Sequence, residues 1–290
     1  MSGKAQAEAP LLAWPGEWGP QRPPVWMILG IILFGLAAVV MVPYTIDAVS
    51  HDDSLRAAYG LVGVLLGISF VAVLLPGLRV RRKQLPDGVT AGHRQDSSPG
   101  LRILFANNYT VVLWLIVAVV FLVLRGIAFL AHLSDSDGSE HSAGIGGIIV
   151  VVIAVALAAF MISYLVRGRR RRGSVLIDPD GLSLSFGSSA RTISWTEIGN
   201  VSPCIVNNSR AVRINPTPGQ RIQVNESRSL LDKMQRGFYE ENMDLHAHAL
   251  RIDPPLLLHL VHYYWLHPEA RDELNSEAAV DRMRRGELLG

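Results

Sequence analysis

The sequence has a single cysteine, Cys204, among 290 residues. One thiol cannot form an internal disulfide, and it excludes zinc and iron–sulfur sites that need several cysteines. Cys204 lies in the segment NVSPCIV, which offers no neighbouring cation to activate a thiol. We therefore predict that Cys204 is a reduced, buried strand residue rather than a nucleophile.

The sequence also lacks the short motifs of the common enzyme classes. It has no P-loop, dinucleotide-binding fingerprint, nucleophile elbow or zinc-protease helix. Two histidine pairs, His246 with His248 and His259 with His262, have a spacing that suits a metal, but no carboxylate or cysteine completes either set. We predict packing or interface histidines, no cofactor, no metal and no enzymatic activity.

Charged residues are nearly absent from four long stretches, at about residues 25–48, 58–78, 109–131 and 144–166. Each has the roughly 20 apolar residues that a helix needs to cross about 30 Å of hydrocarbon. Buried helices of soluble proteins rarely lack charge over such a length. The pattern predicts a transmembrane domain of four helices at residues 25–166. The first stretch is too long for the apolar part of a cleaved signal peptide.

Residues 1–24 combine tryptophans with several prolines, including Trp14, Trp18, Pro23 and Pro24. Prolines prevent a helix there, and tryptophan favours the headgroup region of a bilayer. We predict a disordered tail whose tryptophans lie on the membrane surface. A tail without membrane contact is the alternative.

The loops between the predicted spans differ in charge. Loop 51–57 carries Arg56 against two aspartates, and loop 132–143 carries three acidic residues and no lysine or arginine. The connection between the second and third spans and the linker at 167–173 are strongly basic. By the positive-inside rule, both termini are cytoplasmic in a multi-pass protein of the plasma (inner) membrane. The predicted membrane-surface residues are Arg81, Arg82, Lys83, Arg167, Arg169, Arg170, Arg171 and Arg172.

The charge is distributed unevenly along the chain. From Ser174 onward there are 12 basic and 15 acidic residues, a formal charge of −3, against 15 and 10, or +5, before it. The basic excess therefore lies beside the membrane, where anionic lipid headgroups attract it. A nucleic-acid-binding domain would carry the excess itself, so we predict no nucleic-acid partner.

Arg125 is a strong charge well inside a predicted span, and Asp47 lies at a comparable depth with the opposite sign. An ionisable residue at such depth marks a functional site by default, although arginine can also extend towards the interface. We predict an Arg125–Asp47 pair that fixes two helices. A ligand or ion site and simple extension of Arg125 to the interface are the alternatives.

After the linker, the hydrophobic period changes from that of a helix to that of strands. Segments such as SVLID and LSLSF alternate in polarity and are separated by turn sequences such as DPDG, which predicts about six antiparallel strands over 174–224. HALRI is predicted as a last strand.

Helices are predicted for the end of the chain. Asp253 is expected to cap a helix that starts at Pro254 and continues through PPLLLHLVHYYWLH. A C-terminal helical extension follows at 267–290, and its last helix is capped by Asn275 or Ser276.

The strand order followed by one amphipathic helix resembles a pleckstrin-homology-like (PH-like) domain, at residues 174–266. The opening hairpins resemble the pattern "DGL…R…I.W.EI..V" of bacterial PH-like domains that follow transmembrane helices. The matching residues are Asp180, Gly181, Leu182, Arg191, Ile193, Trp195, Glu197, Ile198 and Val201. The whole chain looks like multi-pass membrane proteins of actinobacteria that carry such a domain.

The resemblance implies a helical membrane bundle with a cytoplasmic α+β, PH-like antiparallel barrel or sandwich. PH-like domains bind lipid, peptide or protein, and no basic phosphoinositide-type loop is visible here. We therefore expect a docking or scaffold module, held by anionic headgroups, that meets a protein partner or a second copy of the chain. The alternative is a small transporter or sensor that uses Arg125 and Asp47.

Overall fold

The computed structural model describes residues 10–86, 88–91, 99–106, 109–135, 173–186, 189–225 and 240–289, with Ile149, Val152, Ile153, residues 155–160 and Ser163. The chain forms two compact units. The β unit is discontinuous and comprises Met1–Arg22, Val80–Ala106 and Arg170–Gly290. The helical unit comprises Pro23–Arg79 and Asn107–Arg169.

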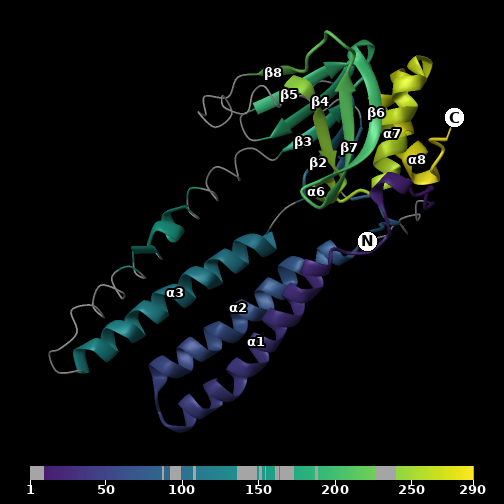
Figure 1. Ribbon diagram of the computed structural model, residues 1–290. Helices are drawn as coiled ribbons and strands as arrows, with labels where there is room; N and C mark the ends of the chain where they lie inside the picture. Colours follow the sequence, from purple (N-terminus) through teal and green to yellow (C-terminus); the bar gives the residue numbers. More distant parts are fainter. Residues whose placement is uncertain are drawn as a thin grey trace. The chain divides into compact units, whose positions relative to one another are not determined.

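The helical unit contains three long helices, α1 (Val25–Ser50), α2 (Ser54–Leu78) and α3 (Tyr109–Asp135) (Figure 1). Each has a segment long and apolar enough to cross a membrane, which agrees with the first three predicted spans. The predicted fourth span, at 144–166, lies largely outside the described residues. Those of its residues that are described are helical.

Glycines on α2 let α1 and α2 pack closely. A Cβ atom added to Gly67 would lie 2.7 Å from the Phe34 carbonyl oxygen and 2.8 Å from the Ala38 Cβ. A Cβ on Gly60 would collide with the Thr45 hydroxyl. Small residues allow such backbone approach between membrane helices. In the sequence, the signal for this close packing is the seven-residue spacing of Gly60 and Gly67.

The close α1–α2 packing can be tested with Gly67→Ala. The added methyl group should destabilise the helical unit by about 1–3 kcal/mol, because it forces apart a packed interface. Gly35→Ala is the control, since no atom lies within 4 Å of its added Cβ, and it should be neutral or slightly stabilising. Thermal unfolding of the full chain in detergent measures both, and equal midpoints would contradict the packing.

The β unit has two antiparallel sheets. The larger has six strands in the order β1 (Val89–Thr90), β2 (Leu101–Leu104), β3 (Ser174–Ile177), β4 (Gly181–Phe186), β5 (Ser189–Ser194) and β8 (Gln223–Asn225). The smaller has three, in the order β6 (Ile198–Val206), β7 (Ser209–Pro216) and β9 (Met243–His246). The six strands predicted over 174–224 are thus present, but they are divided between two sheets.

The connection between α2 and α3 is part of the β unit. Strand β2 pairs with β3 along its length, with Leu101 opposite Ile177 and Ile103 opposite Val175. All four side chains are buried in the core. At the end of β2, the Phe105 amide donates to the Gly173 carbonyl at 2.9 Å. The sequence predicted only a basic loop for this connection, and the pairing of β2 with β3 was not predicted.

Helices follow the last strand: α6 (Ala247–Leu250), α7 (Pro254–Leu266), a 3-10 segment η3 (Pro268–Asn275) and α8 (Glu277–Arg285). The prediction of HALRI as a strand is wrong. The strand β9 lies earlier, and Ala247 and Leu250 are buried on one helical turn that ends at Arg251, whose φ is 54°. The predicted helix at Pro254 and the last helix are confirmed, with Ser276 accepting a bond from the Ala278 amide as its cap.

Helix α7 buries its first five residues, Pro254 to Leu258, in one continuous run, and Leu260, Val261 and Tyr264 continue the buried side. It packs on β6 and β7 (Figure 1). An amphipathic helix buries its apolar side against such surroundings. The C-terminal residues complete them, because Val280 and Met283 of α8 belong to the same core. The region 267–290 is therefore not an extension outside the domain, as the predicted boundary at 266 implied.

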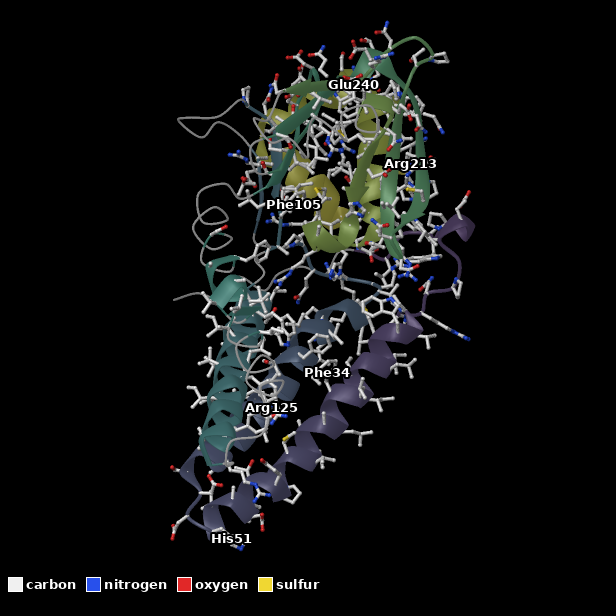
Figure 2. All side chains as sticks on the ribbon, turned by 60° about the vertical axis from the view of Figure 1, so that its left-hand side comes forward. Phe34, His51, Phe105, Arg125, Arg213 and Glu240 are labelled. Atoms are coloured by element: carbon white, nitrogen blue, oxygen red, sulfur yellow. The ribbon has the colours of Figure 1, made fainter. Side chains whose placement is uncertain are left out.

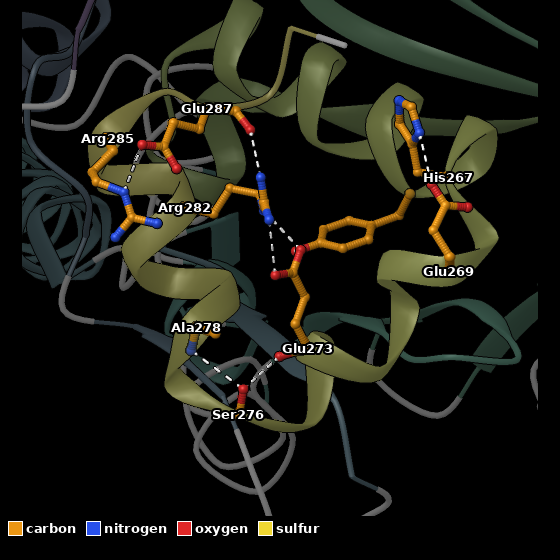
Figure 3. Close-up of polar contacts among 9 residues, drawn as sticks. His267, Glu269, Glu273, Ser276, Ala278, Arg282, Arg285 and Glu287 are labelled. Atoms are coloured by element: carbon orange, nitrogen blue, oxygen red, sulfur yellow. Dashed lines mark hydrogen bonds and ion pairs between the residues drawn. The ribbon is translucent and has the colours of Figure 1, made fainter.

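A polar network joins α7 to the C-terminal helices (Figure 3). The buried Tyr264 hydroxyl donates to Glu273 at 3.0 Å, and the Arg282 guanidinium donates to both Glu273 oxygens, at 2.7 and 3.1 Å. Burial, and then the Glu273 charge, raise the pKa of Tyr264 far above its usual value. The network therefore fixes the C-terminal helices rather than forming a reactive site.

Candidate functional site

Three distant chain segments meet at Arg81, in the connection that follows α2. Its Nε and Nη2 atoms donate to the two carboxylate oxygens of Asp253, each at 3.0 Å, and Nη2 also donates to the Leu12 carbonyl at 2.9 Å. The side chains of Arg81 and Asp253 are 17% and 3% exposed. We call this arrangement the Arg81 joint.

Asp253 does not act as the helix cap that the sequence predicted. Its backbone is extended, as at a cap, but its side chain makes no capping hydrogen bond. The carboxylate instead accepts from Arg81 and from the Arg82 amide at 3.0 Å. Pro255, at the second position of α7, has no N–H to offer a cap, so the carboxylate is available for the arginine.

The N-terminal segment is an ordered part of the β unit. Trp18 is 1% exposed, and its indole N–H donates to the Cys204 carbonyl at 2.9 Å and to the Ala211 carbonyl at 3.2 Å. The Arg210 guanidinium donates to the carbonyls of Pro20 and Arg22, at 3.0 and 2.9 Å. The prediction of a disordered tail on the membrane surface is therefore wrong for residues 10–22, which we call the N-terminal strap.

Trp14 connects the strap to the Arg81 joint. The guanidinium carbons of Arg81 and Arg210 lie 5.4 and 5.1 Å from the centre of its ring, and the ring packs edge-on against Trp18. Cations at this distance from an indole face are attracted to it. The Trp14 indole N–H donates to Gly19 at 2.8 Å, which closes the strap on itself.

The predicted membrane-surface residues differ in their surroundings in the structure. Arg81 belongs to the joint rather than to a lipid-facing surface, because its guanidinium is occupied by Asp253 and Leu12. Arg82 contributes its amide to the same carboxylate, and Lys83 follows it as an exposed residue. The remaining five, Arg167, Arg169, Arg170, Arg171 and Arg172, lie outside the described residues.

The structure does not bring Arg125 and Asp47 together. Asp47 is 50% exposed and pairs with Arg56 at 3.3 Å and with His51 at 3.5 Å. Arg125 lies 5.8 Å from the centre of the Tyr59 ring, partway along the bundle between Phe34 and the His51 turn (Figure 2). Tyr59 is five residues from the start of α2. The predicted pair is therefore wrong within the described residues.

The residues of the PH-like pattern lie on β4, β5, η2 (Trp195–Glu197) and β6 and have structural roles. Trp195 is buried and donates to the Asp178 carbonyl at 2.8 Å, while Glu197 and Ser194 form a capping box. A Cβ on Gly181 would collide with the Ile193 carbonyl. Leu182, Ile193, Ile198 and Val201 are core residues, Asp180 lies in the turn before β4, and Arg191 lies on β5.

Cys204 lies on β6, as predicted, but it is half-buried. Its thiol is 3.9 Å from Asp244, which forms a two-bond ion pair with Arg213. Burial and then the Asp244 charge raise the pKa of the Cys204 thiol above its usual value. A raised pKa leaves little thiolate at neutral pH and argues against a nucleophile.

The first predicted histidine pair, His246 with His248, does not share a strand face, and the second, His259 with His262, lies on a helix as predicted. His246 ends β9 and His248 lies in α6, whereas His259 and His262 lie on α7. An open hollow lies elsewhere on the β unit, lined by residues 215–221 with Glu240 and Glu241.

No family model, curated protein or solved structure matches the chain.

The Arg81 joint should be essential to the β unit. Asp253→Ala leaves the Arg81 guanidinium buried without its counter-charge and should lower the free energy of unfolding by about 3–5 kcal/mol. Asp281→Ala is the control, because it breaks the exposed Asp281–Arg284 pair and should cost less than about 1 kcal/mol. Denaturant unfolding of the full chain, followed by tryptophan fluorescence, compares the two. Similar losses would show that the joint is dispensable.

Helix α7 should make the β unit sensitive to acid. Burial, and then the nearby His262, lower the pKa of His259 below its usual value. The unfolded chain therefore takes up a proton that the folded chain resists, so stability is lost as the pH falls below about 6.5. In His259→Gln, the drop in melting temperature between about pH 7.5 and about 5.5 should be smaller than in the wild type. An unchanged drop would exclude His259 as a cause.

Proposed function

We propose that this protein is a non-enzymatic, multi-pass membrane protein whose β unit is a cytoplasmic PH-like docking or scaffold domain. The observation that carries the proposal is the discontinuity of the β unit. Its three segments come from before α1, from between α2 and α3, and from the C-terminal part of the chain. A domain built in this way is attached to the membrane part at several points rather than by one flexible linker.

The attachments are short. Only Pro23 and Pro24 separate the β unit from α1, and Arg79 alone separates α2 from the next segment of the β unit. Proline restricts the backbone further. Such connections suit a module that presents its surface at a fixed place on the membrane, as a scaffold does.

The same discontinuity supports the proposed topology. Segments that fold together lie on one side of a membrane, so the chain crosses an even number of times between any two of them. Helices α1 and α2 supply two crossings between Arg22 and Val80. Helix α3 requires one more crossing before residue 170, and the stretch 144–166 lies in that interval. Four spans satisfy this count, and the basic connections favour a cytoplasmic β unit.

The strand and helix order supports the PH-like assignment. Hairpins β3–β4–β5 and β6–β7 precede a last strand, and α7 then packs against β6 and β7. Strands β1 and β2 and the N-terminal strap are additions to the PH-like plan. The resemblance to actinobacterial membrane proteins rests on the same hairpins and is part of this proposal, as is a role for the arginines at 167–172 in holding anionic lipid headgroups.

The alternative is a transporter or sensor that uses an Arg125–Asp47 pair, and this pair is not formed in the structure. Asp47 is paired with Arg56 and His51 near the turn between α1 and α2. Arg125 lies beside Tyr59, in the aromatic zone expected near an interface. Neither contact defines a substrate path, so we favour the docking function.

Site-specific photo-crosslinking in intact membranes tests docking. A photoreactive amino acid is introduced singly at four exposed positions of the β unit, Thr217, Glu241, Glu269 and Glu277, and at two exposed positions of α1, Leu33 and Val40. Docking predicts discrete protein adducts from one or more positions of the β unit and none from α1. Adducts confined to α1, or none from the β unit, would contradict it.

A further inference from the structure

The N-terminal strap is held to the β unit without any strand pairing. Within residues 10–22 the only regular structure is the 3-10 turn η1 (Gly16–Trp18), and Pro15 before it has φ −62° and ψ 138°, close to polyproline II. The strap can therefore leave without breaking a β-ladder. Its attachment consists of the side chains of Leu12, Trp14 and Trp18, of which Leu12 and Trp18 lie in the hydrophobic core, and of a few backbone carbonyls.

The surface under the strap recognises features that an extended peptide carries. The paired residues Cys204 and Ala211 of β6 and β7 offer two carbonyls to one indole N–H. The guanidinium groups of Arg210 and Arg81 both lie over the second indole and together donate to three strap carbonyls. This chemistry suits an extended, proline-containing segment with two tryptophans four residues apart, as in Trp14-Pro-Gly-Glu-Trp18.

Removal of the strap would expose buried apolar atoms beside these polar groups. Ala211 is fully buried beside Trp18, and Pro10 of the strap contacts the end of α8 so closely that a Cβ on Gly286 would collide with it. Exposing such surface to water is unfavourable. The groove is thus expected to be filled at all times, by its own strap or by an equivalent segment.

We propose that this groove is a peptide-docking site, that the N-terminal strap is its resident occupant, and that the strap of a second copy of the chain can replace it. The second copy is the occupant because its strap offers the same indoles and carbonyls in the same spacing. Exchange of an identical segment between copies needs no new interface. The inference depends on the described β unit and is independent of the docking function proposed above.

Peptide binding in trans tests the site. A labelled synthetic peptide of residues 10–24 is titrated onto the purified full chain in detergent. Trp18→Ala, which removes the buried indole that anchors the resident strap, should bind it saturably and at least about tenfold more tightly than the wild type. The wild type competes through its own strap at an effective concentration in about the millimolar range. Trp265→Ala, on α7, is the control variant and should behave as the wild type.

A cleavable form of the chain tests the same site without the Trp18→Ala substitution, which could itself cause misfolding. A protease site inserted between Arg22 and Pro23 allows the strap to be cut without changing any contact residue. After cleavage, the labelled peptide should exchange for the native strap, and a peptide with Trp18→Ala should not. Absence of peptide binding to both the Trp18→Ala chain and the cleaved chain would show that the strap is a permanent part of the core and would overturn the proposal.

The second-copy part has its own readout. In a reciprocal exchange both grooves stay filled, so each copy must supply an intact strap. Tagged Trp265→Ala chain should therefore recover untagged wild-type chain, made in the same cells, at least about threefold better than tagged Trp18→Ala chain does. Peptide binding without such recovery would confine the site to free segments and overturn exchange between copies.

Discussion

The ion pair between Arg81 and Asp253 is the interaction on which the β unit depends. Removing two charges from water costs several kcal/mol for each ion, and only good geometry and further hydrogen bonds offset that cost. Here both guanidinium–carboxylate bonds are 3.0 Å long, the Arg82 amide adds a third donor to the carboxylate, and the Leu12 carbonyl accepts a further hydrogen bond from Nη2 of Arg81. Residues 12, 81 and 253 are thereby joined at the buried start of α7.

This joint turns three separate segments into one folded unit. The strap reaches it through Leu12 and Trp14, the α2–α3 connection supplies Arg81 and then strand β2, and the C-terminal segment supplies α7. The β unit therefore cannot complete its core before all three segments are available.

Local sequence patterns predicted the elements that form from neighbouring residues. A run of apolar residues, a turn sequence or a helix cap was enough to predict the three long helices, the strands over 174–224, α7 and α8. The joint could not be found this way, because Leu12, Arg81 and Asp253 are far apart and each has an ordinary local explanation: a tail, a basic membrane exit and a helix cap. The buried position of Trp18 was also missed, because its proline-rich surroundings predicted disorder. HALRI was wrongly predicted as a strand, because so short a segment fits a strand and a helical turn equally well.

The central claim is that the three segments fold together on one side of the membrane. Single cysteines placed by Leu11→Cys, Gln84→Cys and Leu289→Cys in a Cys204→Ala background, each at an exposed position of a different segment, test it directly, with Asp52→Cys in the α1–α2 turn as the reference for the other side. A membrane-impermeant maleimide is applied to intact cells and to inverted vesicles. The account predicts that all three positions react from the same side and that Asp52→Cys reacts from the opposite side. Labelling of any of the three from the side on which Asp52→Cys reacts would contradict it.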